Sequence, residues 1–271
     1  MYEEYWGLKE APFENTPDPR FLYYSKEHEE ALSRLMYVLE GRKGAAMLTG
    51  VFGCGKTVLA RAFLSRINRN IYPVAMITNP YLKLVEFLRS IARQMGAEGL
   101  PEKLTEMSAD HFLQVIEEML NNNAKDGRHT VIIIDEAHVI TDNDIFEELR
   151  LLLNFQLEDK FLITLILMGQ PELTERIKKN KQFSQRIAIG YSLGPLNEAE
   201  SRLYIAHRLR VAGSTHEIFS PEALKPIVEN SGGIPRRINQ ICDMALAVGF
   251  GTEAKLVTAK IIAEAVESIG M

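Results

Sequence analysis

The feature that most constrains this chain is an apolar run that leads into a glycine-rich turn ending in Lys-Thr, at residues 45–57. Gly50 is followed, after four residues, by Gly55-Lys56-Thr57, which matches the pattern G-x4-G-K-[ST]. Glycines tolerate the positive φ angles of a tight loop, whose backbone N–H groups then point inward and can bind an anion. The pattern therefore predicts a phosphate-binding loop between a short buried strand at 45–49 and a helix at 56–68.

The residue types in this loop predict how it would bind ATP. Lys56 would reach the β- and γ-phosphates, and the hydroxyl of Thr57 would hold Mg²⁺. Cys54 lies near a helix N-terminus, where thiol pKa values fall, so the sequence alone allows either a reactive thiol or a variable loop position. The expected nucleotide-binding residues of the loop are Gly50, Val51, Phe52, Gly53, Cys54, Gly55, Lys56, Thr57 and Val58.

A second feature is a run of β-branched residues that ends in two acids, at residues 130–136. Such a run predicts a central parallel strand buried on both faces, and parallel sheets bind ligands at the carboxyl ends of their strands. Asp135 would complete the Mg²⁺ shell through water, and Glu136 would polarise the water that attacks the γ-phosphate. His138 is predicted to cap or pack locally rather than to act in catalysis.

Further polar residues stand where predicted strands end or helices begin. Gln170 follows a doubly buried strand at 161–168 and would touch the γ-phosphate or the attacking water. Arg186 precedes a terminal strand and would project into the phosphates of a neighbouring subunit. Arg236 follows the turn Gly232-Gly233 at a helix start and would reach back to the nucleotide.

The composition limits the classes of protein to which the chain can belong. Of its 271 residues, 46% are hydrophobic and 25% are charged, as in ordinary globular domains. The formal net charge of −5 argues against a strongly cationic nucleic-acid binder, although a local basic patch would not show in that sum. The two cysteines predict reduced thiols rather than a disulfide framework or a zinc site. Because the sequence shows no run of about 18 apolar residues and no apolar leader, we expect a cytoplasmic protein.

Two segments leave alternatives open at this point. The aromatic and proline-rich residues at 5–24 would either line the base side of a nucleotide pocket or pack in a core. The basic helix predicted at 172–181 would either bind nucleic acid or present a solvated face. Deciding between these alternatives requires the environment of the individual side chains.

Together, these elements resemble an AAA+ ATPase module over nearly the whole chain. Residues 50–57 match its Walker A motif, and residues 131–136 match its Walker B motif. The expected fold is a P-loop NTPase of the α/β class, with a parallel sheet sandwiched by helices and followed by a small all-α lid. The expected organisation is an N-terminal segment and helix at 1–44, an α/β ATPase core at 45–194 and a lid with sensor 2 at 195–271.

The resemblance also implies roles for residues outside those two motifs. Gln170 stands at the sensor-1 position, Arg186 matches the arginine finger, and Arg236 belongs to the G-x-P-R of sensor 2. Asn79, at the tip of the second predicted strand, resembles the glutamate-switch residue that would hold Glu136 away from its water until a partner binds. These roles imply an ATP hydrolase that uses ATP and Mg²⁺ in a homo-oligomer, with the arginine finger acting in trans.

More narrowly, the chain is similar to the ExeA/GspA-type ATPases of general (type II) secretion. The similarity is carried by Tyr5-Trp6-Gly7-Leu8 and the proline-rich residues after it, by Gly169-Gln170-Pro171-Glu172-Leu173 and by residues 233–239. It implies a secretion or pilus-assembly ATPase with a secretion-system or membrane protein as partner. Two alternatives remain: a DNA-dependent AAA+ ATPase of the transposition-helper or initiator type, with DNA as partner, and an ATP-gated switch with little turnover.

Overall fold

The computed structural model describes residues 1–100, 108–157 and 160–270. This part of the chain divides into two compact units that are interleaved in the sequence. The first unit contains Met1–His28, Val51–Ala62 and Gly194–Met271, and the second contains Glu29–Gly50 and Phe63–Leu193.

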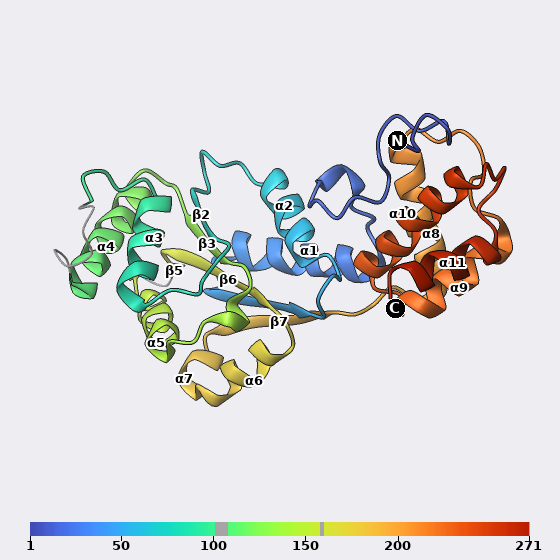
Figure 1. Cartoon of the computed structure of the whole chain (residues 1–271). Coiled ribbons are helices and arrows are strands. Elements are labelled where there is room, and N and C mark those ends of the chain that lie inside the picture. Colours follow the sequence, from blue (N-terminus) through green and yellow to red (C-terminus); the bar gives the residue numbers. More distant parts are fainter. Residues whose placement is uncertain (101–107, 158–159, 271) are drawn as a thin grey trace. The chain divides into compact units, whose positions relative to one another are not determined.

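Within the described residues, the second unit is built on five parallel strands in the order β2-β3-β6-β1-β7 (Figure 1). Their bounds are Ala45–Gly50 for β1, Val74–Ile77 for β2, Thr130–Ile134 for β3, Ile163–Gly169 for β6 and Ile187–Leu193 for β7. Every residue of β3 and β6 is buried, which confirms that their apolar runs form central strands covered on both faces. Because Thr49 pairs with Gly169 and Ile134 with Leu167, β1, β3 and β6 end at the same edge of the sheet.

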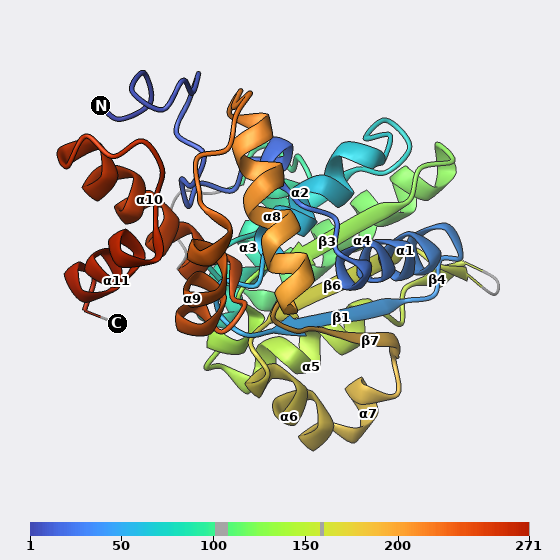
Figure 2. The same ribbon diagram turned by 90° about the vertical axis from the view of Figure 1, so that its right-hand side faces the viewer.

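Helices cover both faces of this sheet. The helix α1 (Lys26–Glu40) lies on one face, and α5 (Asn143–Leu152), α6 (Glu172–Lys179) and α7 (Lys181–Ser184) lie on the other (Figure 1, Figure 2). The expectation of a parallel sheet sandwiched by helices is therefore confirmed. Among the described residues between β1 and β7, the other elements are α2 (Lys56–Arg66), α3 (Leu84–Gln94), α4 (Ala109–Lys125), the 3-10 turn η3 (Ala137–Val139) and the short antiparallel strands β4 (Gln156–Leu157) and β5 (Lys160–Phe161).

Capping hydrogen bonds set two of the helix boundaries. The helix expected at 172–181 is interrupted, because the side chain of Asn180 accepts a hydrogen bond from the N–H of Phe183 and starts a new turn, α7. The next boundary lies at Asp142, whose carboxylate accepts a hydrogen bond from the N–H of Asp144 and caps the start of α5. Capping side chains thus set these boundaries more sharply than the apolar spacing does.

The first unit contains a helical bundle that buries the N-terminal aromatic residues. Its helices are α8 (Glu198–Val211), α9 (Pro221–Ser231), α10 (Pro235–Gly251) and α11 (Ala259–Ser268), with a 3-10 turn η1 (Pro19–Phe21) near the N-terminus. Trp6, Phe13 and Phe21 belong to the same buried apolar cluster as the bundle. The indole of Trp6 also donates a hydrogen bond of 3.0 Å to the carbonyl of Leu246. For these three aromatic residues the packing alternative is confirmed, and they contribute to the core of the first unit.

In the described part of the chain, no helix combines the length and the hydropathy that crossing a membrane requires.

Candidate functional site

The glycine-rich loop of the first unit has the backbone conformation that its sequence predicts. Gly53 and Gly55 adopt φ angles of 86° and 99°, which L-residues with a side chain rarely adopt. The helix α2 begins directly after them, at Lys56. Lys56 is 5% exposed, and its ammonium group donates a hydrogen bond of 3.2 Å to the carbonyl of Val51 at the start of the loop. The loop is therefore a closed turn that ends at a helix N-terminus, which is a favourable place for an anion.

Arg236 lies against this loop, while its predicted contact with the nucleotide stays a prediction. Its backbone N–H donates a hydrogen bond of 3.2 Å to the carbonyl of Gly53. Its guanidinium group lies 4.4 Å from the centre of the Phe52 ring, and Phe52 is 57% exposed. A Cβ atom at Gly53 would lie only 2.6 Å from the Cβ of Arg236, so this approach requires glycine.

A buried histidine supports the same loop, and our sequence analysis did not identify it. The Nε2 atom of His28 lies 3.1 Å from the carbonyl oxygen of Cys54, and its Nδ1 atom lies 2.7 Å from the hydroxyl of Ser25. A carbonyl only accepts hydrogen bonds, so Nε2 carries the hydrogen and Nδ1 accepts from Ser25. Burial lowers the pKa of His28, while the bond to Cys54 acts in the opposite direction. His28 is therefore a neutral donor that fixes one carbonyl of the loop.

The environment of Cys54 decides between the two alternatives left by the sequence. Its side chain is fully buried. Burial raises the pKa of the Cys54 thiol, although the nearby charge of Lys56 acts in the opposite direction. A thiol that stays protonated is a poor nucleophile. The structure therefore contradicts the reactive-thiol alternative.

The second unit presents the predicted acid pair at the carboxyl end of β3. Asp135 is 3% exposed, and one of its carboxylate oxygens accepts a hydrogen bond of 2.9 Å from the N–H of Glu136. Glu136 adopts a left-handed backbone with φ 53° and ψ 32°, which is uncommon for a residue other than glycine. Strained backbone of this kind is concentrated at functional sites, and here it turns the chain into η3 directly after the acids.

His138 connects Glu136 with Gln170, which follows the neighbouring strand β6. Its Nδ1 atom lies 3.3 Å from a carboxylate oxygen of Glu136, and its Nε2 atom lies 3.0 Å from the side-chain nitrogen of Gln170. The structure therefore brings together two residues predicted from sequence, through a third that was expected only to cap or pack locally. The expectation of a purely local role for His138 was incomplete, because His138 also contacts Gln170, which is 32 positions further along the chain.

The basic helix predicted at 172–181 does not present a uniformly solvated face. Arg176 turns inward and donates hydrogen bonds to the carbonyls of His138, at 3.2 Å, and Ile140. Its guanidinium group also lies 5.0 Å from the centre of the Phe146 ring. Arg176 therefore holds the turn after the acid pair, which is a structural role that the charge pattern alone does not indicate.

Asn79 and Arg186 have defined partners in the second unit, while their predicted roles stay predictions. The side-chain oxygen of Asn79 accepts a hydrogen bond of 3.4 Å from the N–H of Tyr81, and Asn79 itself is exposed. Arg186 donates a hydrogen bond of 2.9 Å to the side-chain oxygen of Asn154. It stands just before β7, which is an edge strand of the sheet.

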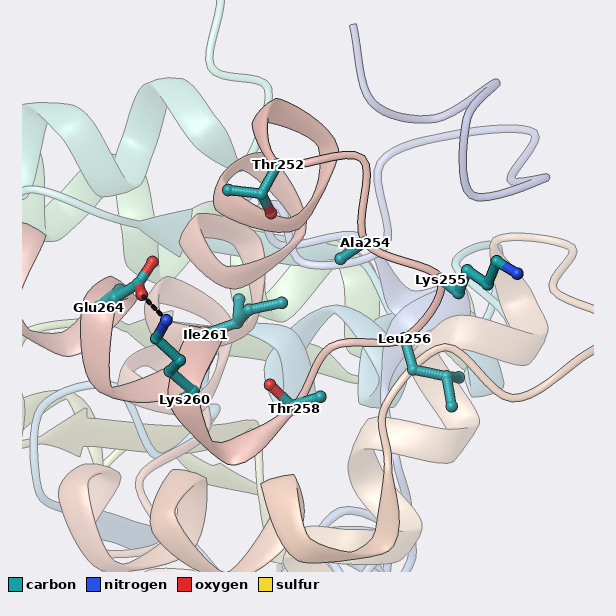
Figure 3. Close-up of a pocket in the computed structure, with 8 residues that line it drawn as sticks. All are labelled: Thr252, Ala254, Lys255, Leu256, Thr258, Lys260, Ile261 and Glu264. Carbon is teal, nitrogen blue, oxygen red and sulfur yellow. Dashed lines mark ion pairs between the residues drawn. The ribbon is translucent and has the colours of Figure 1, made fainter.

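A separate cavity of about 450 Å³ lies in the first unit beside the connection from α10 to α11 (Figure 3). Thr252, Leu256 and Ile261 contribute to its lining. Lys260 and Glu264 also line it and form an ion pair of 3.9 Å with each other. The sequence-predicted site residues are not among its described lining residues, so this cavity adds nothing to the case for nucleotide binding.

The described elements define a class of protein before any comparison is made. A glycine loop that follows β1 and opens a helix, together with an acid pair after the central strand β3, is the arrangement of a P-loop NTPase. The AAA domain family matches residues 39–177, and the chain belongs to this family.

Three known proteins show how far this similarity extends. General secretion pathway protein A of Aeromonas hydrophila is 37% identical over 257 residues, which cover 92% of this chain and 45% of that protein. The chain thus spans less than half the length of this relative. The Aeropyrum pernix ORC2 protein in ADPNP-ADP complexes matches with a TM-score of 0.71 and 19% identity, over 97% of this chain and 72% of its own. The Aeropyrum pernix ORC1 protein in complex with DNA matches with a TM-score of 0.71 and 16% identity, over 96% and 71%. At these identities the two structures show a shared fold alone.

Proposed function

We propose that this chain binds ATP with Mg²⁺ and hydrolyses it. The observation that carries the proposal is the glycine loop, in which Gly53 and Gly55 hold positive φ angles directly before a helix that begins at Lys56. Such a loop directs backbone N–H groups and the positive end of a helix dipole toward one place, which suits a phosphate. Membership of the AAA domain family supports the same conclusion.

The residue types present fit both ATP and its metal ion. The loop amides at 50–58 and the ammonium group of Lys56 bind phosphate oxygens. The hydroxyl of Thr57 and the buried carboxylate of Asp135 hold Mg²⁺, since this ion prefers oxygen ligands and keeps several waters. When bound, the ion neutralises negative charge that develops on the transferred phosphate.

The residues after β3 and β6 act on the attacking water in this proposal. Glu136 accepts a proton from the water, and Gln170 contacts the γ-phosphate or the water itself. Arg236, which contacts the loop through its backbone, also contacts the bound nucleotide in this proposal. Residues 195–271 act as the lid. Asn79 switches Glu136 between a held and a released state when a partner binds.

Hydrolysis depends on assembly in this proposal, because Arg186 supplies positive charge to the phosphates of a neighbouring copy. Its place before an edge strand supports this role, since residues at a sheet edge are available to a second subunit. An arginine finger contributes about 10³- to 10⁵-fold to the turnover number in known cases. A monomer of this chain is therefore a poor ATPase.

The test is the ATPase rate per subunit, measured against protein concentration for the unmodified chain and for Glu136→Gln and Arg186→Ala. We expect a rate that rises with concentration, is abolished by Glu136→Gln and loses its concentration dependence in Arg186→Ala. The variant Lys179→Ala, at an exposed position on α6, is a matched control for the loss of a cation and keeps the normal rate. Assembled turnover that Arg186→Ala leaves unchanged would show that Arg186 is not the arginine finger.

We assign the activity to general secretion or pilus assembly, in the cytoplasm, with a secretion-system or membrane protein as partner. The identity of 37% to General secretion pathway protein A over 92% of this chain supports the assignment. Co-purification with membranes that contain a secretion system, lost on ATP hydrolysis and retained in Glu136→Gln, would test it. An ATP-dependent switch with little turnover would instead show nucleotide-dependent partner binding without hydrolysis.

A DNA-dependent ATPase is the second candidate function. It is favoured by the shared fold with the ORC1 protein that was solved in complex with DNA. The basic helix supports DNA binding less than the charge pattern of the sequence indicated. Arg176 donates to backbone carbonyls, and Lys178 pairs with Glu175 at 3.0 Å. Stimulation of turnover by double-stranded DNA, with a steep salt dependence, would favour this function over the first.

A further inference from the structure

We infer that His138 is a positioning residue that couples Gln170 to Glu136, so that a contact made by Gln170 changes how the carboxylate of Glu136 is held. The inference rests on the proposed function, and it adds His138, to which the sequence motifs assigned no part in hydrolysis. Its basis is one imidazole ring that contacts both side chains. The ring is largely buried, with its side chain 14% exposed.

The chemistry of the two partners sets the direction of the hydrogen bonds. The Nδ1 atom of His138 lies 3.3 Å from the Glu136 carboxylate, and because a carboxylate only accepts, this contact favours the tautomer with the hydrogen on Nδ1. The Nε2 atom is then an acceptor, and it accepts from the side-chain nitrogen of Gln170 at 3.0 Å. The backbone N–H of Gln170 is also placed to donate to Nδ1, at 3.4 Å, which requires the other tautomer, so this bond competes with the contact to Glu136. In the tautomer that Glu136 favours, the donors run from the side chain of Gln170 through His138 toward Glu136.

The surroundings hold the imidazole in this position. Arg176 donates to the carbonyl of His138 itself and to that of Ile140, which fixes the turn that carries the ring. Gly169 faces the ring from the end of β6. A Cβ atom there would lie 3.2 Å from the backbone nitrogen of His138 and 3.3 Å from Nδ1. The left-handed backbone of Glu136 supplies a sharp turn, after which the side chain of His138 lies beside that of Glu136.

The consequence for hydrolysis follows from the donor chain. When the amide of Gln170 turns toward a phosphate or a water, it gives up its bond to Nε2, and the imidazole is free to shift its bond to Glu136. The carboxylate of Glu136 then changes orientation at the moment when Gln170 has made its contact. His138 therefore acts on turnover through Glu136, while the phosphates are bound by the glycine loop.

The first test compares kcat and KM for ATP in the full chain with His138→Ala, His138→Asn and the exposed-site control His111→Ala. Asn keeps a donor near the Nδ1 position and loses the reach to Gln170. We expect His138→Ala to lower kcat about 10- to 100-fold with KM for ATP nearly unchanged, His138→Asn to recover part of kcat, and His111→Ala to match the unmodified chain. Thermal melting of each variant verifies that it is folded.

A double-mutant cycle tests the coupling itself. Gln170→Ala lowers kcat in the unmodified background, and we expect this effect to shrink at least severalfold in the His138→Ala background. If the effects of the two substitutions on kcat multiply independently, the inference is wrong. It is also wrong if His138→Ala keeps kcat within twofold while Glu136→Gln abolishes turnover. In both cases the proposed ATPase function stands.

A measurement that does not require turnover separates the two proposals. Nitrogen-15 spectra of the imidazole groups identify which ring nitrogen carries hydrogen. We expect the signal of His138, assigned through His138→Ala, to show hydrogen on Nδ1 and to shift in both Gln170→Ala and Glu136→Gln. If the chain shows these shifts but has no ATPase activity, the proposed function is wrong and the coupling between Gln170 and Glu136 stands. Hydrogen on Nε2, or a signal indifferent to Gln170→Ala, would overturn the coupling.

Discussion

The glycine loop and the acid pair are held in place by different physical means. Glycine conformation and backbone hydrogen bonds shape the loop, so its pattern lies within eight consecutive residues at 50–57. The acid pair relies on side chains from several segments, among them His138, Gln170 and Arg176. A site made of backbone can be predicted from a short motif, whereas a site held by side chains requires knowledge of which strands are neighbours.

The largest effect that would test this contrast is expected from Gly53→Ala. Alanine at φ 86° is strained, and its Cβ would lie 2.6 Å from the Cβ of Arg236, so the loop or Arg236 must move. We expect ATP affinity, measured by calorimetry, to fall about 10- to 100-fold. Gly96→Ala is the matched control: its φ is 98°, and no other described atom lies within 4 Å of the added Cβ. That variant should lose about 1 kcal/mol of stability and keep its affinity. Equal ATP affinities for Gly53→Ala and Gly96→Ala would contradict the conclusion that glycine conformation shapes the binding loop.

A smaller effect is expected from His28, which shows that even the backbone loop depends on one distant side chain. His28→Ala removes the donor to the Cys54 carbonyl, and we expect ATP affinity to fall about tenfold, the range of one lost buried hydrogen bond. His28→Gln retains an amide donor of similar reach and should recover most of the affinity. If alanine and glutamine behave alike in binding and differ only in melting temperature, His28 serves stability alone.

Much of the fold could be predicted because its signals are local. The runs that became β1, β3 and β6 are short, apolar and followed by polar or glycine residues. The strands β1 and β3 lie where they were expected, whereas β6 begins at Ile163, two residues later than expected, because Phe161 belongs to β5. The inward role of Arg176 could not be predicted, because the carbonyls it reaches lie 36 and 38 positions earlier. The spacing of charges on a helix indicates which residues share a face, and it does not indicate what that face meets. His28 was missed for the same reason, since Cys54 is 26 positions away.

The smallest predicted effect is a pH dependence that originates from His28. Burial lowers its pKa below the ordinary value of 6.5, so as the pH falls below 6.5 the unfolded chain takes up a proton that the folded chain does not. The contribution of His28 to stability is therefore fully present above pH 6.5 and is lost progressively as the pH falls toward its folded-state pKa. We expect the unfolding free energy to fall less steeply between pH 7 and pH 5 in His28→Gln than in the unmodified chain.

Urea unfolding at a series of pH values measures this slope, and His111→Gln, at an exposed position, is the control. If His28→Gln and His111→Gln give the same slope, protonation of His28 does not contribute to the pH dependence of the unfolding free energy. ATP affinity followed over the same range sharpens the contrast between the two regions. A decline that His28→Gln removes would place the pH sensitivity in the loop, because protonation puts a hydrogen on Nδ1 of His28 and ends the hydrogen bond that this atom accepts from Ser25. A decline that persists would place the pH sensitivity outside the loop.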